Sequence, residues 1–365
     1  MAEKIRAGVI GASVNRGWGW RSHIPALQAL PEYELTAICT AHEETAREAA
    51  EATGARLAFS DYREMVSNPE IDLISVAVRV PWHREMVLAA IEAGKHVYCE
   101  WPLGANLPEV IEMADAARSA GVAAMPGMQG RAAPWVLHVK ELIESGYVGR
   151  PLSANAQLLM PSPYMRAGIP WAAQRSSGNH ILSIQAAHSL DILSNCLGGI
   201  EEVSARLETM VEEWPVADST EKVPADAPDC VMLNATTGSG ALLSANFAYV
   251  ASHGSGWRLE IHGDEGTLVV TAGGPPMVAP NRIEGAHRGE ESLGELVTPE
   301  HLITVPPEVK TDSSFHLAHM YQRLAKAIKE STAPEPSFDD AVRLYRLLDT
   351  IAASDDNGGA RTAVS

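Results

Sequence analysis

The loop after the first apolar stretch of the chain carries residue types that bind an anion. Residues 5–10 are apolar and predict a strand, Gly11 ends that stretch, and a helical pattern covers residues 22–30. In such a strand–turn–helix unit the free N–H groups at the helix start point beyond the strand, and a pyrophosphate suits them. The loop residues that could contact this ligand are Gly11, Ser13, Asn15, Arg16 and Trp18.

The glycine spacing departs from the usual dinucleotide fingerprint, Gly-x-Gly-x-x-Gly. Ser13 stands where the second glycine lets a phosphate approach closely, and its hydroxyl can donate a hydrogen bond to a phosphate oxygen instead. Gly17 and Gly19 follow in a longer loop. Two interpretations stay open for this turn alone: a dinucleotide site, or a strand-to-helix turn of some other α/β protein.

The end of the second predicted strand, residues 33–39, bears on which dinucleotide fits. NAD sites usually place Asp or Glu there to bond the ribose hydroxyls, whereas this chain has Thr40 and His42. An uncharged strand end, with Arg16 or Arg47 nearby, would tolerate a 2′-phosphate, so the residues lean slightly to NADP without excluding NAD. Thr40 and His42 could equally be solvated loop residues.

The elements that would position these residues alternate along the first third of the chain. The expected strands are residues 5–10, 33–39, 57–59, 71–78, 96–99 and 122–125, and the expected helices cover residues 43–52, 62–66, 83–93 and 107–117. Asn106 and Glu109 have the form of a capping box before the last of these helices. This alternation predicts an α/β fold with a doubly wound parallel sheet, a Rossmann domain over residues 1–130 followed by a second domain over residues 131–365.

Composition sets the outer bounds on function. The chain has 365 residues, of which 46% are hydrophobic and 20% charged, as in ordinary globular proteins. Its formal net charge of −18 argues against nucleic acid or an anionic membrane as a partner, because both require a basic surface. No signal segment and no apolar run of about twenty residues is present. The cysteines are widely spaced, which predicts reduced core thiols in a cytoplasmic protein and no metal site: Cys39, Cys99, Cys196 and Cys230.

Two later stretches make the interpretation specific. Residues 94–102 read Gly-Lys-His-Val-Tyr-Cys-Glu-Trp-Pro, and residues 127–131 read Gly-Met-Gln-Gly-Arg. Together with the Gly-x-Ser loop and the His-Ile-Pro-Ala-Leu run at residues 23–27, they resemble the glucose-fructose oxidoreductase, inositol dehydrogenase and rhizopine catabolism (Gfo/Idh/MocA) family. Within it, the chain is similar to the branch that includes the fungal galactose-pathway repressor. The resemblance extends over nearly the whole chain.

This resemblance implies that the parallel sheet binds NAD(P) and that a C-terminal α/β domain lays an open, mostly antiparallel sheet over the nicotinamide. Strand-like runs agree with that domain, at residues 152–159, 203–209, 230–235, 241–249, 257–262 and 267–270. We expect an irregular loop over residues 273–299, helices over residues 315–328 and 338–352, and a mobile tail over residues 355–365. Further cofactor residues implied by the resemblance are Val78, Pro81, His83, Glu100, Trp101, Gln129 and Arg131.

The chemistry is expected near His188. Residues 177–191 resemble the helix that carries the family's active-site histidine, which could exchange a proton with a substrate hydroxyl while hydride passes to the nicotinamide. Asp191 lies one helical turn further on and could orient the site or only take part in packing. Judged without the resemblance, His188 could be a structural histidine.

Two departures from the family pattern bear on catalysis. Trp101 stands where the family has Lys, and Ile184 stands four residues before His188, where the family has Asp. An indole N–H can donate a hydrogen bond but does not carry the charge or the protons of an ammonium group. Trp101 could instead stack against a sugar ring or an aromatic substrate. Side chains that could take over part of the task are Tyr164, Asn179, His180 and Arg131.

Two function classes therefore remain. The favoured one is an NAD(P)-dependent dehydrogenase or reductase acting on the CH–OH group of a sugar, polyol or other secondary alcohol, or on the matching carbonyl compound. The alternative is a non-catalytic, dinucleotide-sensing regulator similar to the galactose-pathway repressor, which the missing Lys and Asp favour. A retained His188 beside a hydride carrier favours the enzyme. The resemblance also implies a homodimer or homotetramer with a small-molecule substrate as its other partner.

Overall fold

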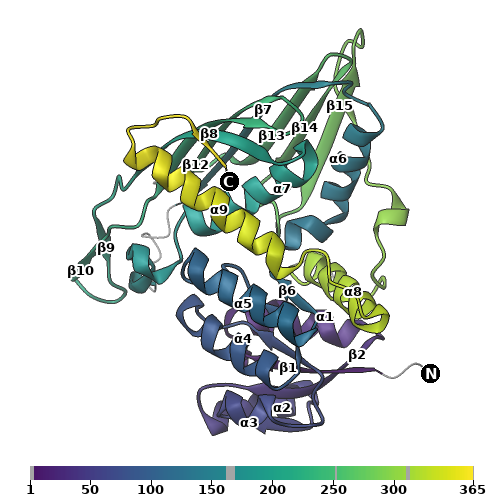
Figure 1. Cartoon of the computed structure of the whole chain (residues 1–365), viewed down its shortest axis with the longest axis vertical. Coiled ribbons are helices and arrows are strands. Elements are labelled where there is room, and N and C mark those ends of the chain that lie inside the picture. Colours follow the sequence, from purple (N-terminus) through teal and green to yellow (C-terminus); the bar gives the residue numbers. More distant parts are fainter. Residues whose placement is uncertain (1–3, 162–168, 251–252, 310–312, 365) are drawn as a thin grey trace. The chain divides into compact units, whose positions relative to one another are not determined.

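The computed structural model describes residues 4–161, 169–250, 253–309 and 313–364, and it divides into two compact units (Figure 1). The first unit consists of residues 1–132 and 304–343, and the second of residues 133–303 and 344–365. The expected scheme of one division after residue 130 therefore lacks the return of the chain to the first unit. Local sequence patterns do not reveal such a return, because it depends on contacts between distant segments.

Within the described residues, the first unit holds a parallel six-stranded sheet in the order β3-β2-β1-β4-β5-β6. This is the doubly wound order, which reverses between β1 and β4, and the predicted Rossmann sheet is confirmed. The strands are β1 (Ile5–Ile10), β2 (Tyr33–Cys39), β3 (Leu57–Phe59), β4 (Leu73–Val76), β5 (His96–Cys99) and β6 (Ala124–Pro126).

The helices that connect these strands follow the capping signals of the local sequence, as the last of them shows most clearly. They are α1 (Ile24–Ala29), α2 (Glu43–Thr53), α3 (Tyr62–Val66), α4 (His83–Glu92) and α5 (Leu107–Ala120). At the start of α5 the Asn106 side chain accepts a hydrogen bond of 3.1 Å from the backbone N–H of Glu109, and Pro108 occupies the first turn. The helix ends at Gly121, whose φ of 67° suits a residue without a Cβ.

Helix α8 (Phe315–Glu330) completes the core of the first unit from far along the chain. Its buried side chains Leu317 and Leu324 belong to the same apolar cluster as Val9 of β1 and Leu27 of α1. The sequence predicted this helix but not the unit to which it belongs. The Rossmann sheet therefore depends on residues beyond 300 for part of its core.

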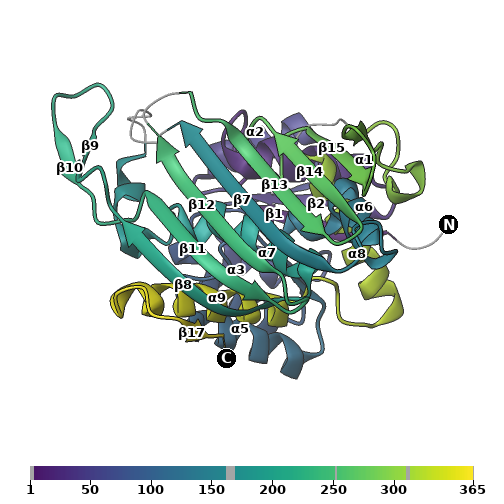
Figure 2. The ribbon, with the colours of Figure 1, turned by 90° about the horizontal axis from the view of Figure 1, so that it is seen from above.

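In the described part of the second unit, nine strands form one sheet in the order β16-β15-β14-β13-β7-β12-β11-β8-β17 (Figure 2). Neighbouring strands are antiparallel except for the parallel pair β7 and β12, so the predicted open, mostly antiparallel sheet is confirmed. The strands are β7 (Pro151–Pro161), β8 (Ile200–Glu208), β11 (Cys230–Thr237), β12 (Leu242–Val250), β13 (Gly256–Gly263), β14 (Gly266–Ala272), β15 (Asn281–His287), β16 (Gly294–Glu295) and β17 (Thr362–Ala363).

One face of this sheet is covered by helices. Trp135 of α6 (Pro134–Glu144) packs edge-on against Trp257 of β13, with 5.4 Å between the ring centroids, and α6 also contacts α7 (Ala187–Leu197). Helix α9 (Phe338–Asp356) begins in the first unit and ends in the second. A small separate hairpin is made by β9 (Glu213–Pro215) and β10 (Lys222–Pro224).

Two expectations for the second half of the chain were wrong. Residues 273–299, expected to be an irregular loop, contain β15 and β16, which extend the sheet beyond β14. The tail, expected to be mobile, pairs through β17 with β8, and an ion pair joins Arg361 to Glu202. In both places the strand is defined by its neighbour in the sheet, and strand formation depends strongly on that context.

The four cysteines are unpaired, and Cys39, Cys99 and Cys196 are buried, as expected of core thiols. Burial raises the pKa of Cys39 to about 12, so this thiol stays protonated at neutral pH. Among the helices of the described ranges, none combines the length and the apolar character that crossing a membrane requires.

Candidate active site

The loop after β1 brings backbone atoms into close contact. Gly11 has a φ of +100°, and a Cβ built on it would lie 2.4 Å from the carbonyl oxygen of Ala77, which follows β4. Gly19 opens the π-helix Gly19–His23, and a Cβ there would lie 2.6 Å from the carbonyl oxygen of Gly11. Gly11 therefore makes the tight turn of the fingerprint. Counted from Gly11, the third glycine of that fingerprint would fall at Arg16, but here Gly19 allows the helix to pack closely on the strand.

The same loop contains polar groups that a bound nucleotide could use. The carbonyl oxygen of Ser13 accepts a 3.1 Å hydrogen bond from the backbone N–H of Arg16, and Asn15 takes the left-handed conformation with a φ of 55°. The indole N–H of Trp18 is buried and has no hydrogen-bond partner among the described residues. A buried donor without a partner beside a glycine turn fits the anionic phosphates of a dinucleotide.

The end of β2 is closed by its own hydrogen bonds. The Thr40 hydroxyl donates to the carbonyl oxygen of His42 at 3.0 Å and lies 2.6 Å from the Thr45 hydroxyl. Helix α2 then begins with Glu43 and Glu44, and the guanidinium of Arg47 lies 3.3 Å from the Glu43 carboxylate. The predicted residues Thr40 and His42 are thus at the carboxyl end of β2, where acidic side chains follow them directly.

His83 joins two loops at the carboxyl edge of the sheet. Its Nδ1 lies 2.9 Å from the carbonyl oxygen of Pro102 and its Nε2 lies 3.1 Å from that of Val78. Burial lowers the pKa of His83, and a neutral ring donates to only one of these two carbonyl oxygens. Pro81 occupies the short 3₁₀ turn Val80–Trp82 between these partners. These contacts give His83 a structural function in holding the loops after β4 and β5 together.

Glu100 and Gln129 lie together beyond β5 and β6. The Gln129 amide donates to both carboxylate oxygens of Glu100, at 3.2 Å and 3.0 Å, and His23 Nε2 lies 2.9 Å from Glu100 Oε1. A Cβ on Gly127 would lie 2.7 Å from Glu100 Oε2, so the glycine leaves the space that this carboxylate occupies. Glu100 and Gln129 were predicted from the sequence as cofactor residues, but no sequence motif indicated that His23 would contact Glu100.

Trp101 and Arg131 flank this pair and are both held by the fold. Trp101 is 7% exposed, so its indole is part of the packed interior of the first unit. The Arg131 guanidinium lies 2.8 Å from the carboxylate of Asp340 at the start of α9. Burial raises the pKa of Asp340, but Arg131 and the backbone N–H of Ser337 outweigh it and hold the pKa below its usual value. This ion pair accounts for Arg131 without a cofactor.

His188 and Asp191 lie in the second unit, one turn apart and both buried on α7. The π-helix Leu182–Ala186 leads directly into α7, so the i−4 spacing of an α-helix does not hold between Ile184 and His188. Single π-turns are frequent at functional sites. The predicted residue Tyr164 lies outside the described residues.

His180 precedes the same π-helix and has a shifted pKa. Burial, together with the nearby Arg175, lowers its pKa to about 4, although Asp226 acts in the opposite direction. At neutral pH the His180 ring is therefore uncharged. Its Nδ1 accepts from the Ser183 backbone N–H at 3.4 Å. Across the described ranges, no three His, Cys, Asp or Glu side chains converge in a way that could hold a metal ion.

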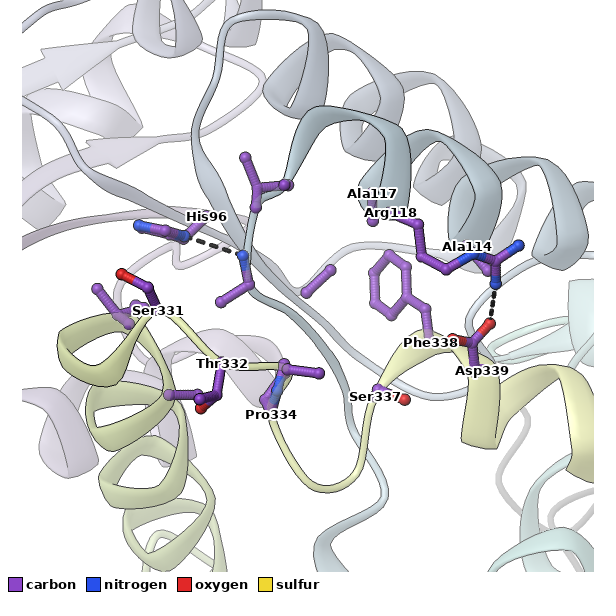
Figure 3. A pocket seen from close by; sticks show the side chains of 17 residues that line it. His96, Ala114, Ala117, Arg118, Ser331, Thr332, Pro334, Ser337, Phe338 and Asp339 are labelled. Atoms are coloured by element: carbon purple, nitrogen blue, oxygen red, sulfur yellow. Dashed lines mark hydrogen bonds and ion pairs between the residues drawn. The ribbon is translucent and has the colours of Figure 1, made fainter.

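A pocket of about 300 Å³ lies at the opposite, amino edge of the six-stranded sheet (Figure 3). It is lined by His96 at the start of β5, by α5, and by the segment between α8 and α9. His96 Nδ1 accepts from the backbone N–H of Ala123 at 3.0 Å, and Arg118 forms an ion pair with Asp339. Because ligands of open α/β sheets bind beyond the carboxyl ends of the strands, this pocket is not the predicted nucleotide site.

Comparison with known proteins agrees with this geometry. Residues 5–128 match the model of the oxidoreductase family with an NAD-binding Rossmann fold, and residues 136–269 match the Gfo/Idh/MocA C-terminal domain. Levoglucosan dehydrogenase of Pseudarthrobacter phenanthrenivorans is 31% identical over 73% of each chain. The galactose/lactose metabolism regulatory protein GAL80 of Saccharomyces cerevisiae is 26% identical over 73% of this chain and 66% of its own.

A solved structure gives the same result. Levoglucosan dehydrogenase in complex with NADH and L-sorbose superimposes with a TM-score of 0.85 at 26% identity, covering 100% of this chain and 99% of that one. The predicted resemblance is confirmed, and both kinds of relative, dehydrogenase and regulator, are present. The chain belongs to the Gfo/Idh/MocA oxidoreductase family, with the NAD-binding Rossmann fold in its first unit.

Proposed function

We propose that this protein is an NAD(P)-dependent dehydrogenase or reductase that acts on the CH–OH group of a sugar or polyol. The observation that carries the proposal is the carboxyl edge of the first unit, where Gly11 and Gly19 allow close approach and the buried Trp18 N–H lacks a partner. These residues would hold the pyrophosphate, and Glu100 would accept hydrogen bonds from a ribose. When bound, the nicotinamide would accept or supply hydride.

His188 is proposed to exchange the proton of the substrate hydroxyl. It is the histidine of the segment that resembles the family's catalytic helix, and it is buried, 8% exposed, next to a π-turn. A positioned acid or base typically accelerates a reaction by about 10²–10⁴-fold. Trp101, in the position of the family lysine, is proposed to shape the site through its ring, because an indole cannot relay the proton.

The test follows reduced nicotinamide absorbance with NAD and NADP against a panel of sugars, polyols and aryl alcohols. Turnover should fall at least 100-fold in His188→Ala and remain in His301→Ala, which removes an exposed histidine of the same unit. Equal losses in both variants would contradict the assignment of His188.

A non-catalytic regulator remains the second candidate, and a specific observation favours it. Trp101 and Ile184 replace two residues that the family uses in catalysis, and GAL80 is a relative of this chain. Tight NADH binding without turnover of any compound in the panel would support the regulator over the enzyme.

The contacts at the end of β2 favour NAD over NADP, against the slight lean of the sequence. A 2′-phosphate placed there would lie near Glu43 and Glu44, while Arg47 is already engaged with Glu43 and the Thr40 hydroxyl with its own loop. Like charges at close range weaken binding. Fluorescence titration with NADH and NADPH should therefore give tighter binding of NADH.

A homodimer or homotetramer in the cytoplasm is proposed from the family resemblance. The uncovered face of the nine-stranded sheet presents two exposed apolar side chains on adjacent strands, Met232 at 53% and Leu242 at 65% exposure. Light scattering should show a dimer or larger species, and Leu242→Arg should shift it toward the monomer.

A further inference from the structure

A buried chain of hydrogen bonds runs beneath the carboxyl edge of the first unit. Ser75 Oγ of β4 lies 2.8 Å from the Tyr321 hydroxyl, which lies 2.6 Å from His23 Nδ1, and His23 Nε2 lies 2.9 Å from Glu100 Oε1. Ser75, Tyr321 and His23 are fully buried, whereas the Glu100 side chain is 12% exposed. The chain of contacts therefore leads from the middle of the sheet to the one member that solvent or a ligand can reach.

With a neutral His23 ring, the chemistry of the four groups gives these hydrogen bonds one direction. A carboxylate only accepts hydrogen bonds, so Glu100 requires the proton of His23 on Nε2. A neutral ring then accepts at Nδ1, where the Tyr321 hydroxyl donates, and Tyr321 in turn accepts from Ser75. Burial raises the pKa of Tyr321, which keeps the phenol protonated as this order requires.

Aromatic packing fixes the middle of the chain. The His23 ring lies edge-on to Tyr98 at 5.4 Å and to Tyr321 at 5.8 Å between centroids. Tyr33 donates a 2.7 Å hydrogen bond to the backbone carbonyl of Tyr321, which anchors α8 beside the sheet. In surroundings of low polarity, hydrogen bonds are stronger and polarise one another.

Glu100 is fixed at its outer end as well. The Gln129 amide donates to both of its oxygens, at 3.2 Å and 3.0 Å, and the absent side chain of Gly127 leaves room for Oε2. The carboxylate is thus bound by His23 and Gln129, and its side chain, 12% exposed, is the part of this network that a ligand can reach. Ribose hydroxyls of a dinucleotide are donors that such a carboxylate can accept.

We propose that Ser75, Tyr321 and His23 are positioning residues that hold the Glu100 carboxylate in one orientation for a ribose of the bound cofactor. Helix α8 is then part of the cofactor site, although Tyr321 is 298 residues from His23 along the chain. The function assigned to Glu100, binding a ribose, rests on the proposed cofactor binding. The order of the hydrogen bonds from Ser75 to Glu100 is independent of it.

The experiment compares Tyr321→Phe with Tyr33→Phe. Both remove one buried hydroxyl from the same aromatic cluster, but only the Tyr321 hydroxyl contacts His23. Nitrogen-15 NMR of the His23 ring should show the neutral tautomer with its proton on Nε2 in the unmodified protein and in Tyr33→Phe. NADH affinity, measured by fluorescence on samples shown to be folded, should weaken at least tenfold in Tyr321→Phe and less than threefold in Tyr33→Phe.

Two results would overturn the inference. One is a His23 ring that is doubly protonated or carries its proton on Nδ1 in the unmodified protein. The other is equal weakening of NADH binding by both substitutions, which would mean that the Tyr321 hydroxyl only supports packing. If the unmodified protein binds neither NADH nor NADPH, the proposed function fails, while the NMR measurement still decides the order of the hydrogen bonds.

Discussion

The two edges of the six-stranded sheet use glycine for different purposes. At the amino edge, Gly54, Gly94 and Gly121 end helices with φ near +70°, and a Cβ on any of them would meet no atom within 4 Å. At the carboxyl edge, a Cβ on Gly11 or Gly19 would come within 2.6 Å of a backbone oxygen. The first group only reverses the chain direction, whereas the second allows close backbone packing at the predicted nucleotide site.

Both edges are hollowed, since the loop after β1 at the carboxyl edge also lines a pocket, of about 620 Å³, and what distinguishes the edges is the kind of side chain that each presents. The amino-edge pocket of about 300 Å³ has an exposed ion pair between Arg118 and Asp339. The carboxyl edge has crowded glycines and buried polar groups such as Glu100, whose hydrogen bonds fix its orientation. Oriented, buried polar groups are what binding and catalysis require.

The strongest test of this comparison replaces one glycine at each edge. Gly11→Ala combines a left-handed backbone with a Cβ 2.4 Å from the Ala77 carbonyl oxygen, and it should cost about 4 kcal/mol and abolish NADH binding. Gly94→Ala, with a φ of +72° and open space, should cost about 1 kcal/mol and leave binding unchanged. Urea unfolding and fluorescence titration measure both, and similar costs for the two would break the distinction.

Two neighbouring aspartates at the start of α9 allow a second test. The buried Asp340 carboxylate is paired with both Arg131 and Arg343, so Asp340→Asn removes the negative charge that these two guanidinium groups share and should cost about 3 kcal/mol. Asp339 is 40% exposed and paired with Arg118 beside the amino-edge pocket, so Asp339→Asn should cost less than about 1 kcal/mol. Urea unfolding at pH 7 compares the pair, and a larger cost for Asp339→Asn would reverse the comparison.

The Asp340 ion pair should also give a defined pH dependence. Its pKa in the folded protein is below its usual value, so its contribution is fully present above the unfolded pKa, about 3.9. That contribution is lost as pH falls through the lower, folded pKa. The difference in unfolding free energy between the unmodified protein and Asp340→Asn should thus be constant from pH 7 to pH 5 and shrink below about pH 4. A difference that grows on acidification would contradict the assignment.

The smallest effect is expected from filling the amino-edge pocket. Ala333 is an exposed residue of its lining, and Ala333→Leu should change the unfolding free energy by less than about 0.5 kcal/mol. NADH affinity should stay within twofold of the unmodified value. A tenfold weakening would show that this pocket takes part in nucleotide binding.

Much of the fold could be predicted because its signals are local. The buried strand around Ile74 and the helix ends at Gly94 and Gly121 are visible in a few residues each. The return of α8 to the first unit, the strands β15 to β17 and the π-turn before His188 were missed. Each of these depends on a partner far away in the chain or on a register that side-chain types do not encode.

The site was predictable to a similar extent. Motifs identified Glu100 and Gln129, and the structure brings them together with the predicted edge residues Val78 and His83 of the same unit. Tyr321 and Ser75 were missed, because a tyrosine on an amphipathic helix and a serine in a buried strand resemble ordinary core residues. The assignments of His188 and Asp191 as site residues stay predictions.

The return of α8 to the first unit has a consequence for how the protein is made. Synthesis proceeds from the amino terminus, and domains ordinarily fold as soon as they leave the ribosome. Here the apolar surface that awaits Leu317 and Leu324 stays uncovered until most of the polypeptide has been translated. The nascent first unit must therefore remain incomplete throughout the emergence of the second, and it is the last segment of this early domain that decides when it becomes stable.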